Sequence, residues 1–140
     1  MEIGISEAIQ HFFSTPSFDL IYSEALANAL DAGARNIGIF ISLHSFSEPN
    51  TLEITINDDG EGFSENNFAK FSKLLSKSDS SHKGLGRLIY LKYFSKVYVE
   101  SVFDKNNKRT FIFVNTFKGE SNIEKLDSDI PSYSKLTFKS

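Results

Sequence analysis

The chain contains no cysteine, and this absence excludes a disulfide framework, a thiolate zinc site and thiol-based nucleophilic catalysis. No apolar run approaches the ~18 residues that a membrane-spanning helix needs, and no basic segment leads into an apolar one at the amino terminus. The chain also has no excess of positive charge: 15 Lys and Arg residues stand against 18 Asp and Glu residues, which gives a net charge of -3. A surface that coats nucleic acid or anionic lipid is therefore not expected. Together these absences favour a cytoplasmic protein.

The residues that are present describe an ordinary folded chain. Its 140 residues, of which 40% are hydrophobic and 24% charged, suffice for one domain with a single core. No repeat, linker or low-complexity tract divides them. We therefore expect one domain over residues 1–140.

Apolar periodicity and breaker residues predict the elements of this domain. Helical spacing predicts helices over 6–13, 18–34, 66–75 and 85–95, with Gly33 ending the second of them. Alternating apolar residues predict strands over 36–46, 51–58, 96–104, 109–117 and 135–139, and a turn at Asn106-Asn107. In the first two strands the core faces should carry Ile37, Ile39, Ile41, Leu43, Leu52, Ile54 and Ile56. This order predicts an α+β fold, a two-layer sandwich with a mixed, mostly antiparallel sheet and helices on one face.

Three polar side chains form a stripe on the second predicted helix. Glu24, Asn28 and Asp31 are spaced i, i+4 and i+7, so they lie on one side. A solvated face is the ordinary interpretation, but the rest of this helix is small and apolar and carries no lysine or arginine. We therefore expect the stripe to line a cleft. A carboxylate one turn from a carboxamide suits metal-assisted phosphoryl transfer, in which Glu24 orients a water and Asn28 completes the shell of Mg²⁺.

A second polar group ends the strand 51–58. Asp58 shares the parity of Ile54 and Ile56, so its carboxylate should face inward. It is followed by Asp59-Gly60-Glu61-Gly62, where glycine allows a close approach to the backbone. Two interpretations remain open. Asp58 either bonds its own backbone in a strand-ending turn, or accepts the amino hydrogens of an adenine in an apolar slot.

The third group is the segment 76–87, which contains Lys77, Lys83 and Arg87 against the single acid Asp79. Its glycines, Gly84 and Gly86, lie at the start of the helix predicted at 85–95. Free N–H groups at the start of a helix suit a polyphosphate. A flexible linker that runs into a helix is the alternative. The spacing fits neither a Rossmann fingerprint nor a P-loop.

Taken together and in order, these segments resemble a known family. ALANALDAGA (25–34) preceded by Glu24, ITINDDGEGF (54–63) and SHKGLGRLIYLKYFSKVYVES (81–101) resemble the ATP-binding domain of the GHKL superfamily of gyrase, histidine kinase, MutL and heat-shock chaperone ATPases. A weaker similarity to the closing strand of that domain covers 133–139. The first segment resembles the MutL, MORC and chaperone branch more than the sensor kinases. The resemblance implies the Bergerat fold, with ATP and Mg²⁺ as cofactors.

The resemblance also implies roles for individual residues. Glu24 would be the general base and Asn28 the magnesium ligand. Asp58 would hold the adenine. The implied nucleotide-binding residues are Asn28, Asp31, Ala32, Asp58, Gly60, Gly62, Lys83, Gly84, Leu85, Gly86, Arg87 and Ser134. Residues 72–85 would form a lid over the phosphates.

The chain departs from the pattern of the family in two respects. Asp59 stands where relatives commonly have asparagine, which would add negative charge near a triphosphate. The chain also ends shortly after the closing strand, whereas relatives continue into a domain that supplies a cation to the γ-phosphate. We therefore expect the N-terminal part of a longer protein, with firmer ATP binding than turnover, that uses ATP or ADP as a switch for homodimerisation or for docking a downstream domain. The alternatives are a small anti-sigma-type protein serine kinase and a nucleotide-binding regulatory module without hydrolysis.

Overall fold

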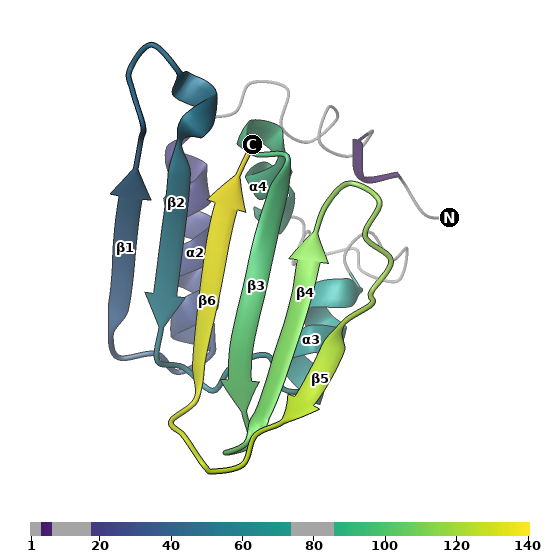
Figure 1. Ribbon diagram of the computed structural model, residues 1–140. Helices are drawn as coiled ribbons and strands as arrows, with labels where there is room; N and C mark the ends of the chain where they lie inside the picture. The colour runs from purple at the N-terminus through teal and green to yellow at the C-terminus, as the bar shows by residue number, and fades with distance from the viewer. Residues whose placement is uncertain (1–3, 7–17, 74–85) are drawn as a thin grey trace.

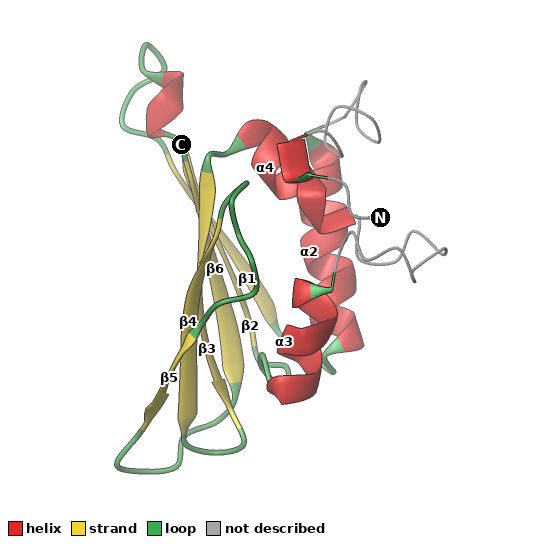
Figure 2. Cartoon of the chain, turned by 90° about the vertical axis from the view of Figure 1, so that its right-hand side faces the viewer, coloured by secondary structure: helices red, strands yellow, loops and turns green. Residues whose placement is uncertain are grey.

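The computed structural model describes residues 4–6, 18–73 and 86–140. These residues form a six-stranded sheet with the helices on one face (Figures 1 and 2). The elements in chain order are α2 (Asp19–Asp31), β1 (Ile37–Ser42), the 3₁₀ turn η1 (Pro49–Thr51), β2 (Glu53–Asp58), α3 (Glu65–Ser72), the 3₁₀ turn η2 (Gly86–Ile89), α4 (Tyr90–Tyr93), β3 (Lys96–Phe103), β4 (Asn107–Phe113), β5 (Asn122–Lys125) and β6 (Tyr133–Lys139). The predicted two-layer α+β fold is confirmed. Most of the helix predicted over 6–13 lies outside the described residues.

The sheet has the order β1-β2-β6-β3-β4-β5, and each neighbouring pair is antiparallel. The last strand, β6, therefore lies in the middle, between β2 and β3 (Figure 1). Its residue Ser134 pairs with Asp58 on one side and with Ser101 on the other. This insertion brings the carboxyl end of β2 and the start of β6 together beneath the helices.

Helix α2 forms because it is rich in alanine and leucine, which have high helix propensity. Gly33, with φ +79°, ends it as predicted. The N–H of Gly33 donates to Leu30 O at 3.0 Å and that of Ala34 to Ala29 O at 3.0 Å, which is a Schellman motif. The motif ends the helix at Asp31, three residues before the predicted end.

The core lies between the sheet and the helices. Ile21, Ala25 and Ala29 of α2 cover the buried Ile54 and Ile56 of β2. Beside them, the rings of Phe63, Phe68, Phe71, Phe111, Phe113 and Phe117 pack mostly edge to face. Within the described ranges, no helix has the length and apolar character to cross a membrane.

The structure corrects several predicted details. The expected core face of β1 is covered only in part, because Ile37 packs against the core but Ile39 and Ile41 are 40% and 61% exposed. Strand β1 is the edge strand of the sheet. The turn before β4 covers residues 104–106, with φ of 46° at Asp104 and 75° at Lys105. Asn106 belongs to it as predicted, but Asn107 does not, because it already pairs with Phe103.

Two further elements differ from the prediction. The helix expected over 85–95 is split into η2 and the short α4. Strand β5 was not predicted, because its four residues are all exposed and show no buried alternation. It is held by pairing with β4 instead.

Candidate functional site

A cavity of about 400 Å³ lies on the helix side of the sheet. Its walls come from α2, from the β2–α3 segment, from η2 and α4, and from β6. The residues that line it are Ala25, Asn28, Ala29, Asp31, Ala32, Ile56, Asp58, Gly62, Phe63, Asn67, Lys70, Phe71, Arg87, Tyr90, Ser134 and Leu136. Segments that are distant in the sequence thus meet at one hollow.

Most of the candidate residues from the sequence meet at this cavity. Its lining includes Asn28, Asp31, Ala32, Asp58, Gly62, Arg87 and Ser134. Glu24, Gly60 and Gly86 are neighbours of lining residues but are not part of the lining itself. Lys83, Gly84 and Leu85, with nearly all of the expected lid, lie outside the described residues.

Asp58 occupies the end of β2, where it pairs with Ser134 of β6. Its Oδ1 accepts a hydrogen bond from the N–H of Gly60 at 2.9 Å. Burial raises the pKa of the Asp58 carboxyl, the Gly60 bond opposes the shift, and the neighbouring Asp59 adds to it. The turn bond of the first interpretation is present, and Asp58 also lines the hollow. Its binding of adenine stays a prediction.

Asp59 is not among the residues that line the cavity, although its charge acts on the neighbouring Asp58. Its Oδ1 accepts from the N–H of Arg35 at 2.7 Å and of Asn36 at 2.9 Å, and its Oδ2 accepts from Asn36 Nδ2 at 2.9 Å. These bonds, first among them the one from the Asn36 side chain, lower the pKa of Asp59 to about 2. Asp59 therefore ties the end of β2 to the α2–β1 loop.

Glu24 and Asn28 are joined one helical turn apart, because Asn28 Nδ2 donates to Glu24 Oε1 at 3.2 Å. Burial raises the pKa of Glu24, while the positive charge of Arg87 and the bond from Asn28 oppose this shift. A Cβ added at Gly86 would collide with the Glu24 carboxylate. Glycine at position 86 thus allows η2 to lie directly on Glu24.

Arg87 borders the same space from η2. Its guanidinium lies 4.5 Å from the ring centre of Phe71, and its Nη1 donates to Lys70 O at 3.3 Å. Burial lowers the pKa of Arg87, and Glu24 opposes this shift. The arginine therefore links the wall formed by α3 to the carboxylate on α2.

The sequence reasoning missed the wall that α3 contributes. Asn67 and Lys70 of α3 line the cavity, with Phe63 just before the helix. Asn67 Nδ2 donates to Glu61 Oε1 at 2.7 Å and to Gly62 O at 2.9 Å, which fixes the β2–α3 loop. The spacing of Asn67 and Lys70, which lie on one face of α3, was a signal available in the sequence.

Two buried residues, Ser101 and Tyr90, also shape the site, although no motif singled them out. Ser101 Oγ accepts from the N–H of Phe63 at 2.7 Å and donates to Tyr133 O at 2.8 Å. It lies beside Gly62, whose φ is +81° and where a Cβ would collide with Val102 O. Tyr90, which is fully buried, lies 3.4 Å from Asn28 Nδ2 through its hydroxyl.

In the parts of the chain that the structure describes, no group of three or more His, Cys, Asp or Glu residues is placed to hold a metal ion. Asn28 lines the cavity, and its carboxamide oxygen is a group that can ligate a cation.

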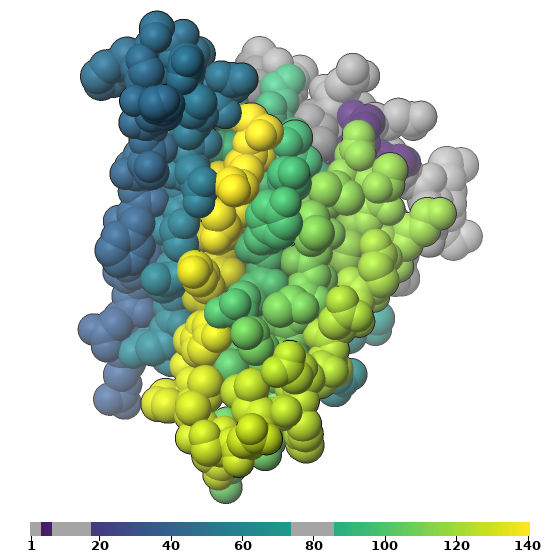
Figure 3. All heavy atoms as spheres, in the orientation of Figure 1, coloured from purple at the N-terminus to yellow at the C-terminus, as the bar shows by residue number. Residues whose placement is uncertain are grey.

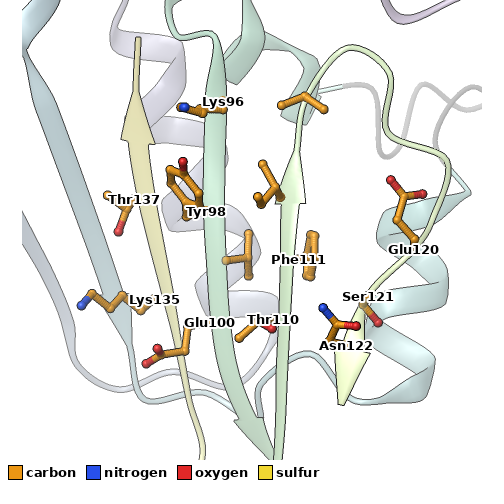
Figure 4. A pocket seen from close by; sticks show the side chains of 13 residues that line it. Lys96, Tyr98, Glu100, Thr110, Phe111, Glu120, Ser121, Asn122, Lys135 and Thr137 are labelled. Carbon is orange, nitrogen blue, oxygen red and sulfur yellow. The ribbon is translucent and has the colours of Figure 1, made fainter. Parts of the chain in front are cut away.

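A larger hollow of about 830 Å³ lies on the opposite, helix-free face of the sheet (Figures 3 and 4). Lys96, Lys135, Glu100 and Glu120 border it, so its charges are mixed. Glu100 accepts from the hydroxyl of Tyr133 at 2.7 Å and pairs with Lys108 at 3.6 Å. None of the predicted site residues that the structure describes borders this hollow, and size alone does not make it the functional site.

Comparisons with known proteins agree with this geometry. The family model described as histidine kinase-, DNA gyrase B-, and HSP90-like ATPase matches residues 17–139. No curated protein matched the chain.

Three solved structures with similar folds illustrate the likeness. The ATPase region of Saccharomyces cerevisiae topoisomerase II is 20% identical with a TM-score of 0.58, over 89% of this chain and 38% of that one. The N-terminal domain of a DNA repair protein is 15% identical with a TM-score of 0.65, over 98% and 39%. The topoisomerase IV ATP-binding domain of Francisella tularensis is 19% identical with a TM-score of 0.57, over 99% and 73%. At these identities the likeness concerns the fold, and the chain spans less than two-fifths of the first two structures.

Proposed function

The chain belongs to the histidine kinase-, DNA gyrase B-, and HSP90-like ATPase family, and we propose that it is a Mg²⁺-dependent ATP-binding domain that hydrolyses ATP slowly. One observation carries the proposal. Asn28, Asp58 and Arg87 come from three distant segments and line the same cavity of about 400 Å³. An amide, an acid and a cation around one hollow suit a nucleotide with its metal ion.

The purine end of the proposed site is the floor between β2 and β6. Asp58 supplies an acceptor there, Ser134 lies beside it, and Ile56 and Leu136 supply apolar contact. An ionised carboxylate accepts from the amino group of adenine but repels the oxo group that guanine carries at the same position. We therefore expect selection of ATP over GTP.

The phosphate end lies between α2 and η2. Asn28 Nδ2 donates to Glu24, which leaves the carboxamide oxygen for a cation, so the residues present fit Mg²⁺. When bound, Mg²⁺ would neutralise phosphate charge. Glu24 would accept a proton from the attacking water, and the burial that raises its pKa makes it a stronger base. Gly86 and Arg87 would lie against the phosphates, as would Lys83, Gly84 and Leu85.

We infer slow turnover from the charges of the described part of the cleft. Among the described lining residues the cations are Lys70 and Arg87, and the charge of Arg87 already interacts with that of Glu24. Poor neutralisation of the transition state slows phosphoryl transfer by orders of magnitude. Nucleotide would then act as a switch that favours self-association or docking of another domain. The segment Asn-Ala-Leu-Asp-Ala-Gly-Ala supports placement in the MutL, MORC and chaperone branch.

A calorimetric titration with ATP, ADP and GTP, each with and without Mg²⁺, tests the binding proposal. We expect ATP and ADP to bind, Mg²⁺ to tighten ATP binding, and GTP to bind at least about tenfold more weakly. Absence of ATP binding, or equal affinity for GTP, would contradict it.

Replacing the proposed base, Glu24→Ala, separates binding from hydrolysis. Phosphate release should fall by about 10²–10⁴-fold, because the water loses its proton acceptor, while ATP still binds. Release of phosphate in single-turnover assays measures the first and calorimetry the second. Glu124→Ala on the exposed strand β5 is the control. Unchanged turnover in Glu24→Ala would rule Glu24 out as the base, and transfer of phosphate to a protein would favour the kinase alternative.

A further inference from the structure

The carboxamide of Asn28 has two chemically different ends, and a cation can use only one of them. Its Nδ2 donates to Glu24 Oε1 at 3.2 Å and lies 3.4 Å from the hydroxyl oxygen of Tyr90. An ionised carboxylate only accepts, and a phenol oxygen can accept as well. Glu24 therefore selects the NH₂ end of Asn28, Tyr90 can accept the second N–H of that end, and the oxygen end is left for the cavity that Asn28 lines.

The two neighbours differ in how firmly they are held. Glu24 sits on the same helix as Asn28 and is half-buried. Tyr90 comes from a separate element, is fully buried and packs its ring edge-on against Phe138 at 4.8 Å. Leu88 and Ile89, just before it, are also fully buried. The hydroxyl of Tyr90 is thus anchored in the core, independently of the helix that carries Asn28.

We propose that Tyr90 is a positioning residue that holds the Asn28 carboxamide with its oxygen toward the cavity, where it can ligate the cation of a bound nucleotide. A reversed carboxamide would set its oxygen against the oxygens of Glu24 and would present NH₂ to the cation. The Glu24 carboxylate disfavours this reversal, and the hydroxyl of Tyr90, by accepting the second N–H, holds the amide group in its position. The inference rests on the proposed function in one respect only: it takes the bound ligand to be a nucleotide with its cation.

Tyr90→Phe removes the hydroxyl and keeps the ring that packs on Phe138. We expect the Mg²⁺ concentration that gives half of the metal-dependent gain in ATP affinity to rise about 3- to 10-fold, as for the loss of one hydrogen bond. ATP affinity without Mg²⁺ should stay within about twofold of wild type, because the purine contacts are untouched. A merely structural defect would instead lower the affinity for ATP both with and without Mg²⁺.

Tyr133→Phe is the matched control. It removes a tyrosine hydroxyl that donates to Glu100 at 2.7 Å on the helix-free face of the sheet, and the Mg²⁺ requirement should not change. In an Asn28→Ala background, Tyr90→Phe should add nothing, because the side chain on which it acts is gone. A further rise in that background would show that Tyr90 acts by another route and would overturn the inference.

A measurement on the nucleotide-free protein decides the inference independently of ATP. The side-chain NH₂ signals of Asn28, identified in ¹⁵N spectra by their loss in Asn28→Ala, should exchange with water several-fold faster in Tyr90→Phe than in wild type. Unchanged signals and an unchanged Mg²⁺ requirement would overturn the role of Tyr90. A wild-type protein that fails to bind ATP would instead overturn the proposed function, and the NH₂ signals would still report whether Tyr90 holds Asn28.

Discussion

Two adjacent carboxylates at the end of β2 are shifted in opposite directions. Burial raises the pKa of Asp58, whereas hydrogen bonds from Asn36 and Arg35 lower the pKa of Asp59 to about 2. A carboxyl whose pKa is lowered on folding stabilises the fold above its unfolded value of 3.8, and this contribution is lost as the pH falls toward 2. A raised pKa has the reverse effect. Ionised Asp58 thus disfavours folding at neutral pH, although Asp59, one residue away, favours it.

Asp58→Asn should therefore weaken ATP binding without weakening the fold. At pH 7 we expect the free energy of unfolding in urea to equal or exceed that of wild type, because an uncharged amide replaces a half-buried anion and its oxygen can still accept from Gly60. The gain should shrink as the pH falls through the raised pKa of Asp58, which becomes neutral, and should be absent below pH 3.8. ATP affinity should fall about 10- to 100-fold, since the acceptor for the adenine amino group is lost. A destabilised variant that binds ATP normally would contradict both parts.

At the scale of elements, the sequence predicted the parts of the site that follow a regular period. The stripe of Glu24 and Asn28 and the inward parity of Asp58 depend only on the helical and strand repeats. Gly33 was likewise predictable as a helix end, because a left-handed residue is needed there. These local rules do not depend on what packs against the element.

Features that depend on tertiary partners could not be predicted in this way. The alternation of β1 indicated a buried face, but its position at the sheet edge leaves Ile39 and Ile41 exposed. The bond that Asp59 accepts from Asn36 depends on the packing of two separate segments and has no signal in the sequence. The approach of Gly86 to Glu24 and of Tyr90 to Asn28 joins residues 62 positions apart, and neither a period nor a turn signal encodes such contacts.

At the scale of the whole molecule, a buried arginine joins the sheet to the helix layer beneath the cleft. Arg109 of β4 is 2% exposed. Its Nη1 donates to Phe63 O at 3.1 Å and to Ser64 O at 3.2 Å, and its Nη2 donates to Glu65. The guanidinium also lies 4.3 Å from the ring centre of Phe68. One side chain thus fixes the start of α3, which is the wall of the cavity opposite α2.

Arg109→Lys should loosen this connection while leaving the charge in place. An ammonium group lacks the planar fork that serves two carbonyls and a carboxylate at once and that stacks on a ring. We expect the free energy of unfolding to fall by about 2–4 kcal/mol, which corresponds to a melting temperature lower by roughly 6–15 °C for a domain of this size. Thermal and urea unfolding measure the two quantities.

The neighbouring cation on the same strand provides the control. Lys108 pairs with Glu100 at 3.6 Å on the partly exposed, helix-free face, and an ion pair of that kind contributes about 0–1 kcal/mol. Lys108→Ala should therefore change stability by less than about 1 kcal/mol. Since Arg109 is not among the residues that line the cavity, saturating ATP should still raise the melting temperature of Arg109→Lys by linkage. Equal stability of Arg109→Lys and Lys108→Ala would show that the phenylalanine core alone joins the sheet to the helix layer.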